Sequence, residues 1–194
     1  MHSLVERLAR IMAIAGGVVL TALVALTCVS VLGRGLNTFG HSDTLKTLSE
    51  GAANALIATG VGPVNGDFEL VEAGVAFAIF AFLPICQLYG SHATVDVFTN
   101  ALPPKVNRII VTFWEVVLTA VILLITWRLF VGLQSKMAYG ETTFLLQFPV
   151  WWAYGFSFLA AVVASLVAVY CAIARIIELM TGRHILPYAG EAIH

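Results

Sequence analysis

Four ionisable side chains lie in or beside apolar stretches of this chain, and their types could do chemistry. His92 and Asp96 are four residues apart where an apolar stretch ends, a spacing that places an imidazole and a carboxylate on one face of a helix. Glu115 lies within another apolar stretch, and Glu72 lies at the start of one. A charge beside lipid is costly unless it meets a partner or water, so each of these residues needs an explanation.

Glu115 belongs to a stripe of polar residues at helical spacing, which predicts a polar seam along one helix face. Such a seam serves either as an ion path or as a contact face for another helix. A proton relay uses a chain of acids or histidines through the bilayer, whereas Glu115 stands alone, so we favour the contact role. The members of the seam are Arg108, Thr112, Glu115, Thr119 and Thr126.

Glu69 and Glu72 lie one turn apart at the start of the second apolar stretch. In the first turn of a helix they would be stabilised by the positive end of the helix dipole. Arg34 directly follows the first apolar stretch, near the same membrane boundary, and an ion pair with Glu72 is a second, compatible interpretation. The hypothesis is that Arg34, Glu69 and Glu72 join the outer ends of the first two helices.

His92 and Asp96 lie too close to the membrane boundary to relay protons across the bilayer. We expect them to lie on a continuation of the second helix and to fix its cytoplasmic end. Pro103 and Pro104 follow as a stop signal, because proline cannot continue a helix.

The cysteines and the net charge argue against a metal, redox or nucleic-acid function. Cys28, Cys86 and Cys171 each lie alone in an apolar stretch, without a C-x-x-C pair or a histidine at ligand spacing. A net charge of -1 provides no basic surface for a nucleic acid. We therefore expect no catalytic residue, no metal site and no cofactor, and we expect that the chain is not an enzyme.

The elements that carry these residues are predicted to be membrane-spanning helices. Of the 194 residues, 60% are hydrophobic and 11% are charged, whereas about 25% charged residues is usual in soluble domains. A helix needs about 20 largely apolar residues to cross a bilayer, and the sequence predicts such spans at 11–33, 73–95, 109–127 and 149–174. The expected fold is an all-α integral membrane protein with a single membrane domain over residues 1–194.

The connection between the first two spans is long enough to hold a helix of its own. Leucine and alanine at helical spacing predict an amphipathic helix over residues 42–58, lying on the outer membrane surface. Ser42 or Asp43 can cap its start, and Gly60 can end it. It is too short and too rich in glycine and proline to be a fifth span.

Small residues predict where the spans pack closely, because they allow helix backbones to approach one another. In the first span such residues recur every four positions, at Ala13, Gly17 and Thr21. In the fourth span they form a longer stripe of Ser157, Ala161, Ala164, Ala168 and Ala172.

The basic residues favour an orientation with both termini in the cytoplasm, because basic loops resist export. Six of the ten Lys and Arg residues then lie on the cytoplasmic side and four lie outside. The first span is predicted to be retained, since its uncharged run is longer than the core of a signal peptide and Arg34 follows it at once. The cytoplasmic set is Arg7, Arg10, Lys105, Arg108, Arg175 and Arg183, and the outer set is Arg34, Lys46, Arg128 and Lys136.

Several short stretches, in this order, resemble the small membrane subunit of tripartite ATP-independent periplasmic (TRAP) transporters, the DctQ-like family. The first match is Arg34 after the first span. The second is the stretch "FELVEAGVAFAIFAFLPICQLYGSHATVDVF", which carries Glu69, Glu72, His92 and Asp96, and it is followed by "LPPKVNR" and by "GETTFLLQFPVWWAYGFSF" before the fourth span. The outer connection at 37–66 departs from the family by being longer than usual.

The resemblance implies a small permease subunit of a sodium-coupled secondary transporter for organic acids in the bacterial inner membrane. Its implied partners are a large multi-span membrane subunit, a periplasmic solute-binding protein and membrane lipids. The large subunit would carry the solute by an elevator motion, and the small subunit would brace its fixed scaffold without binding substrate. In agreement, the sequence contains no pair of broken helices and no inverted repeat of the kind that carriers use.

Two other functions remain as alternatives. A four-helix membrane redox protein would need paired histidines or cysteines inside the bilayer, and the histidines all fall at span ends or in loops. An autonomous small exporter would exchange protons at Glu72 or Glu115, and it would transport without a partner.

Overall fold

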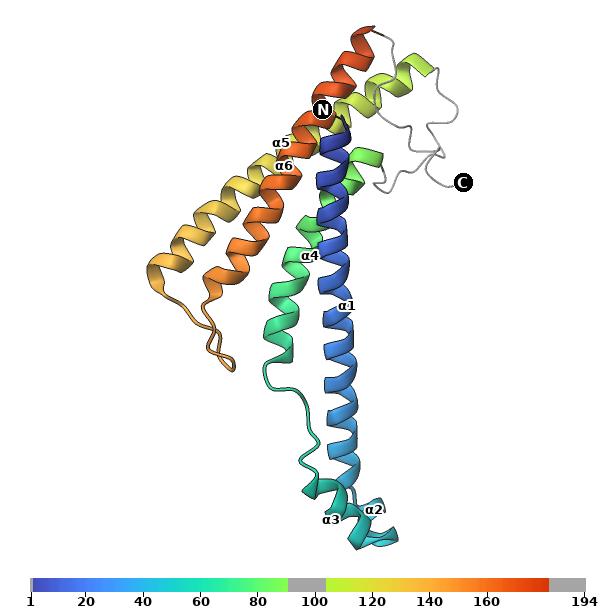
Figure 1. Ribbon diagram of the computed structural model, residues 1–194, viewed down its shortest axis with the longest axis vertical. Helices are drawn as coiled ribbons and strands as arrows, with labels where there is room; N and C mark the ends of the chain where they lie inside the picture. Colours follow the sequence, from blue (N-terminus) through green and yellow to red (C-terminus); the bar gives the residue numbers. More distant parts are fainter. Residues whose placement is uncertain (1, 91–103, 182–194) are drawn as a thin grey trace.

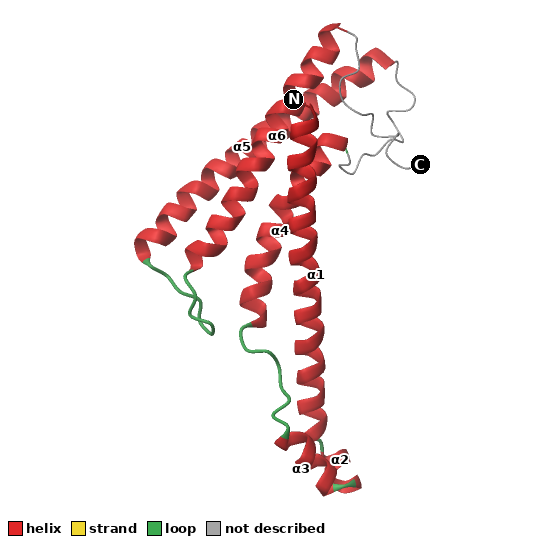
Figure 2. Ribbon diagram, in the orientation of Figure 1, coloured by secondary structure: helices red, strands yellow, loops and turns green. Residues whose placement is uncertain are grey.

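The computed structural model describes residues 2–90 and 104–181, and in these ranges the chain is helical, with connecting loops and a single isolated bridge between Thr142 and Pro149 (Figure 2). Four helices are long and apolar enough to cross a membrane, α1, α4, α5 and α6. This confirms the predicted all-α membrane fold. In chain order the helices are α1 (His2–Gly40), α2 (Asp43–Leu48), α3 (Glu50–Ala58), α4 (Asp67–Tyr89), α5 (Pro104–Tyr139) and α6 (Val150–Thr181).

The membrane helices differ in length from the uncharged stretches that predicted them, because caps rather than charges end a helix. α1 continues past Arg34 to Gly40, and α5 begins at Pro104 and continues to Tyr139. α4 ends at Tyr89, where Gly90 adopts the left-handed conformation (φ 60°) of a helix C-cap. The second span was expected at 73–95, so its predicted end at residue 95 is wrong for α4. The start of α4, at Asp67, lies six residues before the predicted start.

The connection between α1 and α4 holds two short helices where one was predicted over 42–58. Ser49 has an extended backbone (φ −162°, ψ 102°) between α2 and α3, and its hydroxyl accepts a hydrogen bond from the Ala52 amide. Serine is a favoured N-cap, so it starts a new helix here and interrupts the old one. Figure 1 shows α2 and α3 at the end of α1 away from the N-terminus, beyond the start of α4 and the loop between α5 and α6.

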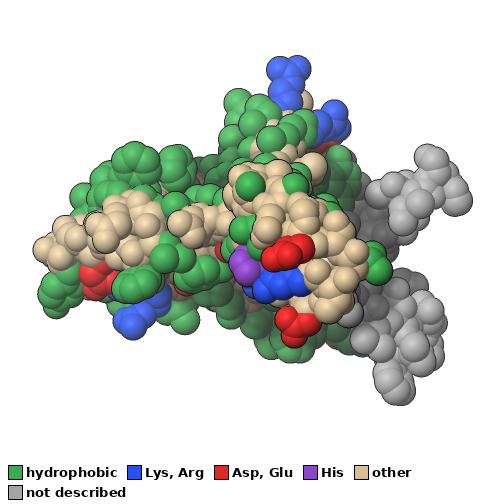
Figure 3. Space-filling view, turned by 90° about the horizontal axis from the view of Figure 1, so that it is seen from below, with side chains coloured by type: hydrophobic (Ala, Val, Ile, Leu, Met, Phe, Trp, Pro, Cys, Tyr) green, Lys and Arg blue, Asp and Glu red, His purple; other side chains and the backbone are tan. Residues whose placement is uncertain are grey.

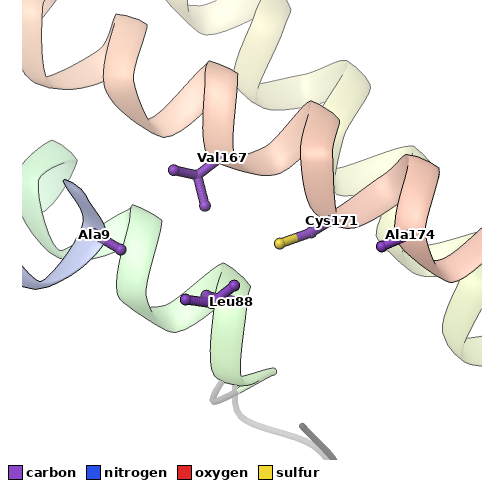
Figure 4. Packing of buried hydrophobic residues seen from close by; sticks show 5 residues of the cluster. All are labelled: Ala9, Leu88, Val167, Cys171 and Ala174. Carbon is purple, nitrogen blue, oxygen red and sulfur yellow. The ribbon is translucent and has the colours of Figure 1, made fainter. Parts of the chain in front are cut away.

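The four long helices pack in the order α1, α4, α6, α5, with the most extensive contacts between successive members of this row. Figure 1 shows the pairs α1–α4 and α5–α6 converging near the N-terminus and diverging toward the other end, so that they form the two arms of a V. At the convergent end, Ala9, Leu88, Val167, Cys171 and Ala174 form a buried apolar cluster. There Val167 and Cys171 of α6 point toward Leu88 of α4 (Figure 4).

α1 packs on α4 through a face that repeats every seven residues. Ala9, Gly16 and Ser30 are buried on this face, and Leu23 contacts Gly74 of α4. A seven-residue repeat keeps one helix face against a partner that coils around it. The predicted face at Ala13, Gly17 and Thr21 is wrong, since Thr21 is exposed and a Cβ on Gly17 would meet nothing within 4 Å.

α5 packs on α6 through the two stripes that the sequence predicted. The Thr119 hydroxyl donates to the Ala168 carbonyl oxygen (3.2 Å), and the Thr126 and Ser165 hydroxyls lie 2.8 Å apart. All five members of the α6 stripe are buried. The polar seam of α5 is therefore a helix-contact face.

Large apolar side chains cover much of the outside of the row. Val18 and Leu32 of α1 are 64% and 66% exposed. Seen from the end that carries α2 and α3, hydrophobic side chains lie beside exposed backbone and uncharged polar groups, with a few scattered charged groups (Figure 3). Such a surface suits lipid or another membrane subunit.

Candidate functional site: polar contacts at the two ends of the helices

The C-terminal part of α1 and the N-terminal end of α4 are joined through Ser30. Its hydroxyl donates a short hydrogen bond to the Asp67 carboxylate and accepts one from the Val64 amide (3.2 Å). Arg34 lies one turn further along α1, and its guanidinium is 3.9 Å from the same carboxylate. Arg34 is mostly exposed, so this pair adds little stability, and the buried Ser30 is the main link.

Arg34 thus pairs with Asp67, and the expected pair with Glu72 is not formed. Asp67 and Glu69 occupy the first turn of α4, while Glu72 falls in the second turn. The sequence reasoning missed Asp67 because it considered only Glu69 and Glu72 as acids in the first turn of this helix. The signal that could have found it is an acid directly after Gly66, where a glycine commonly precedes a helix.

Close backbone contact at Gly33 holds the same junction together. A Cβ on Gly33 would overlap the carbonyl oxygen of Gly62 and lie 2.9 Å from its carbonyl carbon. Asn37 donates from its side chain to the Val61 carbonyl oxygen at 2.9 Å. The segment that leads into α4 is therefore fitted against α1 over two turns.

Glu69 joins the two arms of the V. Its carboxylate accepts hydrogen bonds from the Leu145 amide (2.7 Å) and the Leu146 amide (3.0 Å), both in the loop between α5 and α6. The side chain of Leu146 packs on Gly66, where a Cβ would come within 2.8 Å of its Cδ atoms. Glu69 was expected to join α1 to α4, and it instead fixes α4 to the loop of the other arm.

Glu72 is exposed and lies at a cavity of about 500 Å³ between the arms. Residues of α4, α5, α6 and the α5–α6 loop form its walls. The walls are mostly apolar or aromatic, and Glu69, Thr143 and Ser157 are their other polar members. This cavity was not foreseen from the sequence, because its walls come from segments far apart in the chain.

Glu115 is buried at the convergent end of the V and has a partner. The side-chain amide of Gln87 on α4 donates to its carboxylate at 2.7 Å. On α6, Arg175 and Glu178 form a buried ion pair at 2.9 Å, and Arg175 also attracts the charge of Glu115. Together these four residues tie α4, α5 and α6 through polar groups that would be costly to leave unpaired.

The sequence reasoning found Glu115 and missed its surroundings. Gln87 carries no charge and so attracted no attention, and Arg175 was counted only for membrane orientation. Arg175 and Glu178 are three residues apart in the sequence, a spacing that predicts a pair on one helix face.

The remaining predicted site residues have smaller roles or lie outside the described ranges. Arg108 is half-buried near the start of α5, and its backbone carbonyl accepts from the Thr112 hydroxyl at 2.9 Å. His92 and Asp96 lie outside the described residues. Within the ranges 2–90 and 104–181 no three metal-ligating side chains come together.

Comparison with known proteins identifies the family. No curated protein and no solved structure matches the chain. A family model does match over residues 23–181, that of the tripartite ATP-independent periplasmic transporters, DctQ component. The match covers most of the chain, including the part of α1 from residue 23 onward and the whole of α4, α5 and α6. The protein with Glu69 between its arms and Glu115 in its buried polar cluster therefore belongs to the DctQ component family of TRAP transporters.

Proposed function

We propose that this chain is the small permease subunit of a sodium-coupled transporter for organic acids, and that it braces the large membrane subunit without binding the solute. A periplasmic solute-binding protein delivers the acid, and the large subunit carries it inward past a fixed scaffold. The chain lies in the bacterial inner membrane with both termini in the cytoplasm. Membership of the TRAP transporter family supports this assignment.

The observation that best supports a bracing role is how the polar side chains of the membrane helices are used. Within the described residues, Gln87, Glu115, Thr119 and Thr126 bond between helices or to a neighbouring helix backbone. Carriers instead form their sites at broken helices near the middle of the bilayer, whereas each long helix here is continuous. Polar groups that satisfy one another hold helices in place.

A disulfide lock tests whether the chain works as a static part. Cβ atoms at positions 16 and 81 would lie 3.0 Å apart, near the roughly 3.5–4.5 Å of a disulfide. We would replace the three native cysteines, introduce Gly16→Cys with Ala81→Cys, and reconstitute the whole transporter in liposomes. Oxidation should link α1 to α4 and leave sodium-driven uptake unchanged.

The matched control is Gly17→Cys with Ala81→Cys, because Gly17 points away from α4 and should form no link. A loss of uptake that appears on oxidation of the first pair alone, and that a reductant restores, would contradict the bracing role. It would show that α1 and α4 must move during transport.

Reconstitution of the chain alone separates this proposal from an autonomous exporter. The bracing role predicts that liposomes containing only this chain accumulate no solute and dissipate no proton gradient faster than empty liposomes. Proton-coupled efflux that is lost in Glu72→Gln would favour the exporter.

A further inference from the structure

The cavity between the arms is a feature that a bracing role does not use. Its volume of about 500 Å³ falls within the roughly 300–1,000 Å³ of small-molecule sites. Aromatic rings from three segments form much of its wall, Phe80 on α4, Phe144 and Phe148 in the α5–α6 loop, and Tyr154 on α6. A site of this composition suits an apolar chain.

Glu72 gives the cavity a negative charge. In the ranges 2–90 and 104–181 no ion pair includes Glu72. Glu69 is a second acid in the wall, but two loop amides already satisfy its carboxylate. Glu72 is therefore the acid in this wall with its charge free for a ligand.

Ser157 provides an independent indication of a ligand. Its side chain lies in the cavity wall and is 2% exposed, and its hydroxyl has no hydrogen-bond partner among the described residues. A buried hydroxyl without a partner costs free energy. A polar atom of a bound molecule would remove that cost.

We propose that this cavity binds an aliphatic ammonium group carried on an apolar chain. Glu72 balances the ammonium charge, the aromatic rings enclose the chain and attract the cation through their faces, and Ser157 forms a hydrogen bond to the polar end of the ligand. An aliphatic ammonium group occurs in soluble amphiphilic amines, directly on the apolar chain, and in phosphatidylethanolamine, where a phosphate separates it from the acyl chains.

The first test is direct binding to the full-length chain in a non-ionic detergent. Native mass spectrometry would count octylammonium, octanoate and octanol bound per chain. Octylammonium should bind at one site and octanoate should not. Glu72→Gln should weaken octylammonium binding by about tenfold, as expected for one charge-assisted contact, and should leave octanol binding unchanged.

Glu50→Gln is the matched control, because Glu50 is an exposed acid on α3 outside the cavity. Equal effects of Glu72→Gln and Glu50→Gln, or equal binding of octylammonium and octanoate, would overturn the proposal. Ala153→Leu provides a second variant that fills the cavity and keeps Glu72. It should abolish octylammonium binding while the melting temperature shows that the variant is folded.

Lipid nanodiscs distinguish the two sources of the amine. The chain would be extracted from an equal mixture of phosphatidylethanolamine and phosphatidylglycerol, and the retained lipids would be counted. Retention of phosphatidylethanolamine that is lost in Glu72→Gln supports a lipid ligand. Equal retention of both lipids, together with octylammonium binding that depends on Glu72, supports a soluble amphiphile.

Discussion

Gly33→Ala tests the junction between α1 and the segment that enters α4. Alanine is a better helix former than glycine by about 1 kcal/mol in an exposed helix interior. At Gly33, however, the new methyl group would overlap the Gly62 carbonyl group. The position of a Cβ atom is fixed by its own backbone and the Gly62 carbonyl group is itself backbone, so neither can turn aside, and the segment at 61–67 must move away from α1.

The cost can be worked from the contacts that this movement breaks. Overpacking costs about 1–3 kcal/mol, and the two hydrogen bonds of Ser30, to Asp67 and Val64, contribute about 1 kcal/mol each. After the gain in helix propensity, Gly33→Ala should lower the free energy of unfolding by about 2–4 kcal/mol. Gly35→Ala is the matched control, since a Cβ there would meet nothing within 4 Å.

Thermal unfolding of the purified full-length chain in detergent, followed by circular dichroism, measures the difference. A change of 1 kcal/mol shifts the melting temperature of a chain of this size by about 2–4 °C. Gly33→Ala should therefore melt several degrees below the native chain, and Gly35→Ala should melt at or above it. Equal melting temperatures for the two variants would refute the close contact between Gly33 and Gly62.

Three further predictions concern the other contacts. Glu69→Gln should lower the free energy of unfolding by about 1–2 kcal/mol, because the Leu145 and Leu146 amides lose a charged hydrogen-bond acceptor. Hydrogen exchange should become faster at these two amides. Unchanged exchange would contradict the link between the arms. Gln87→Leu should lower the free energy of unfolding by about 1–3 kcal/mol, because the Glu115 carboxylate loses its hydrogen-bond donor. In a double-mutant cycle, adding Glu115→Leu should recover part of that loss. Additive losses would argue against the Gln87–Glu115 hydrogen bond. Gly16→Val should destabilise the chain by about 1–3 kcal/mol more than Gly17→Val, and melting curves that coincide would place the α1 contact face elsewhere.

The number of membrane-spanning helices could be predicted from the sequence, because a helix that crosses a bilayer needs a long apolar segment and the sequence contains four of them. The α5–α6 interface was also predictable. Thr119 and Thr126 face a stripe of small residues that includes Ala161 and Ala168, and both stripes follow the helical period. A local sequence pattern is enough to predict a helix contact when both helices of the contact show the pattern.

Contacts that depend on a distant segment could not be predicted in this way. Ala13 and Gly17 form a plausible packing stripe, but the shape of α4 selects Gly16, one position away. Arg34 was paired with Glu72 because Asp67, its partner in the structure, was not counted among the acids of the first turn of α4. Gln87 is uncharged, and its role is evident only from the structure, in which Glu115 of α5 lies beside it and accepts its hydrogen bond.

Because its long helices pack in a single row, in the order α1, α4, α6, α5, the molecule is flat like a plate and is not a rounded bundle. Helices are about 10 Å across, and four of them placed side by side present two broad faces and two narrow edges to their surroundings. A plate turns in a fluid bilayer less easily than a rounded bundle of the same mass. A subunit attached to one broad face would therefore be hindered from rotating, because the lipid against the other face resists rotation of the flat molecule.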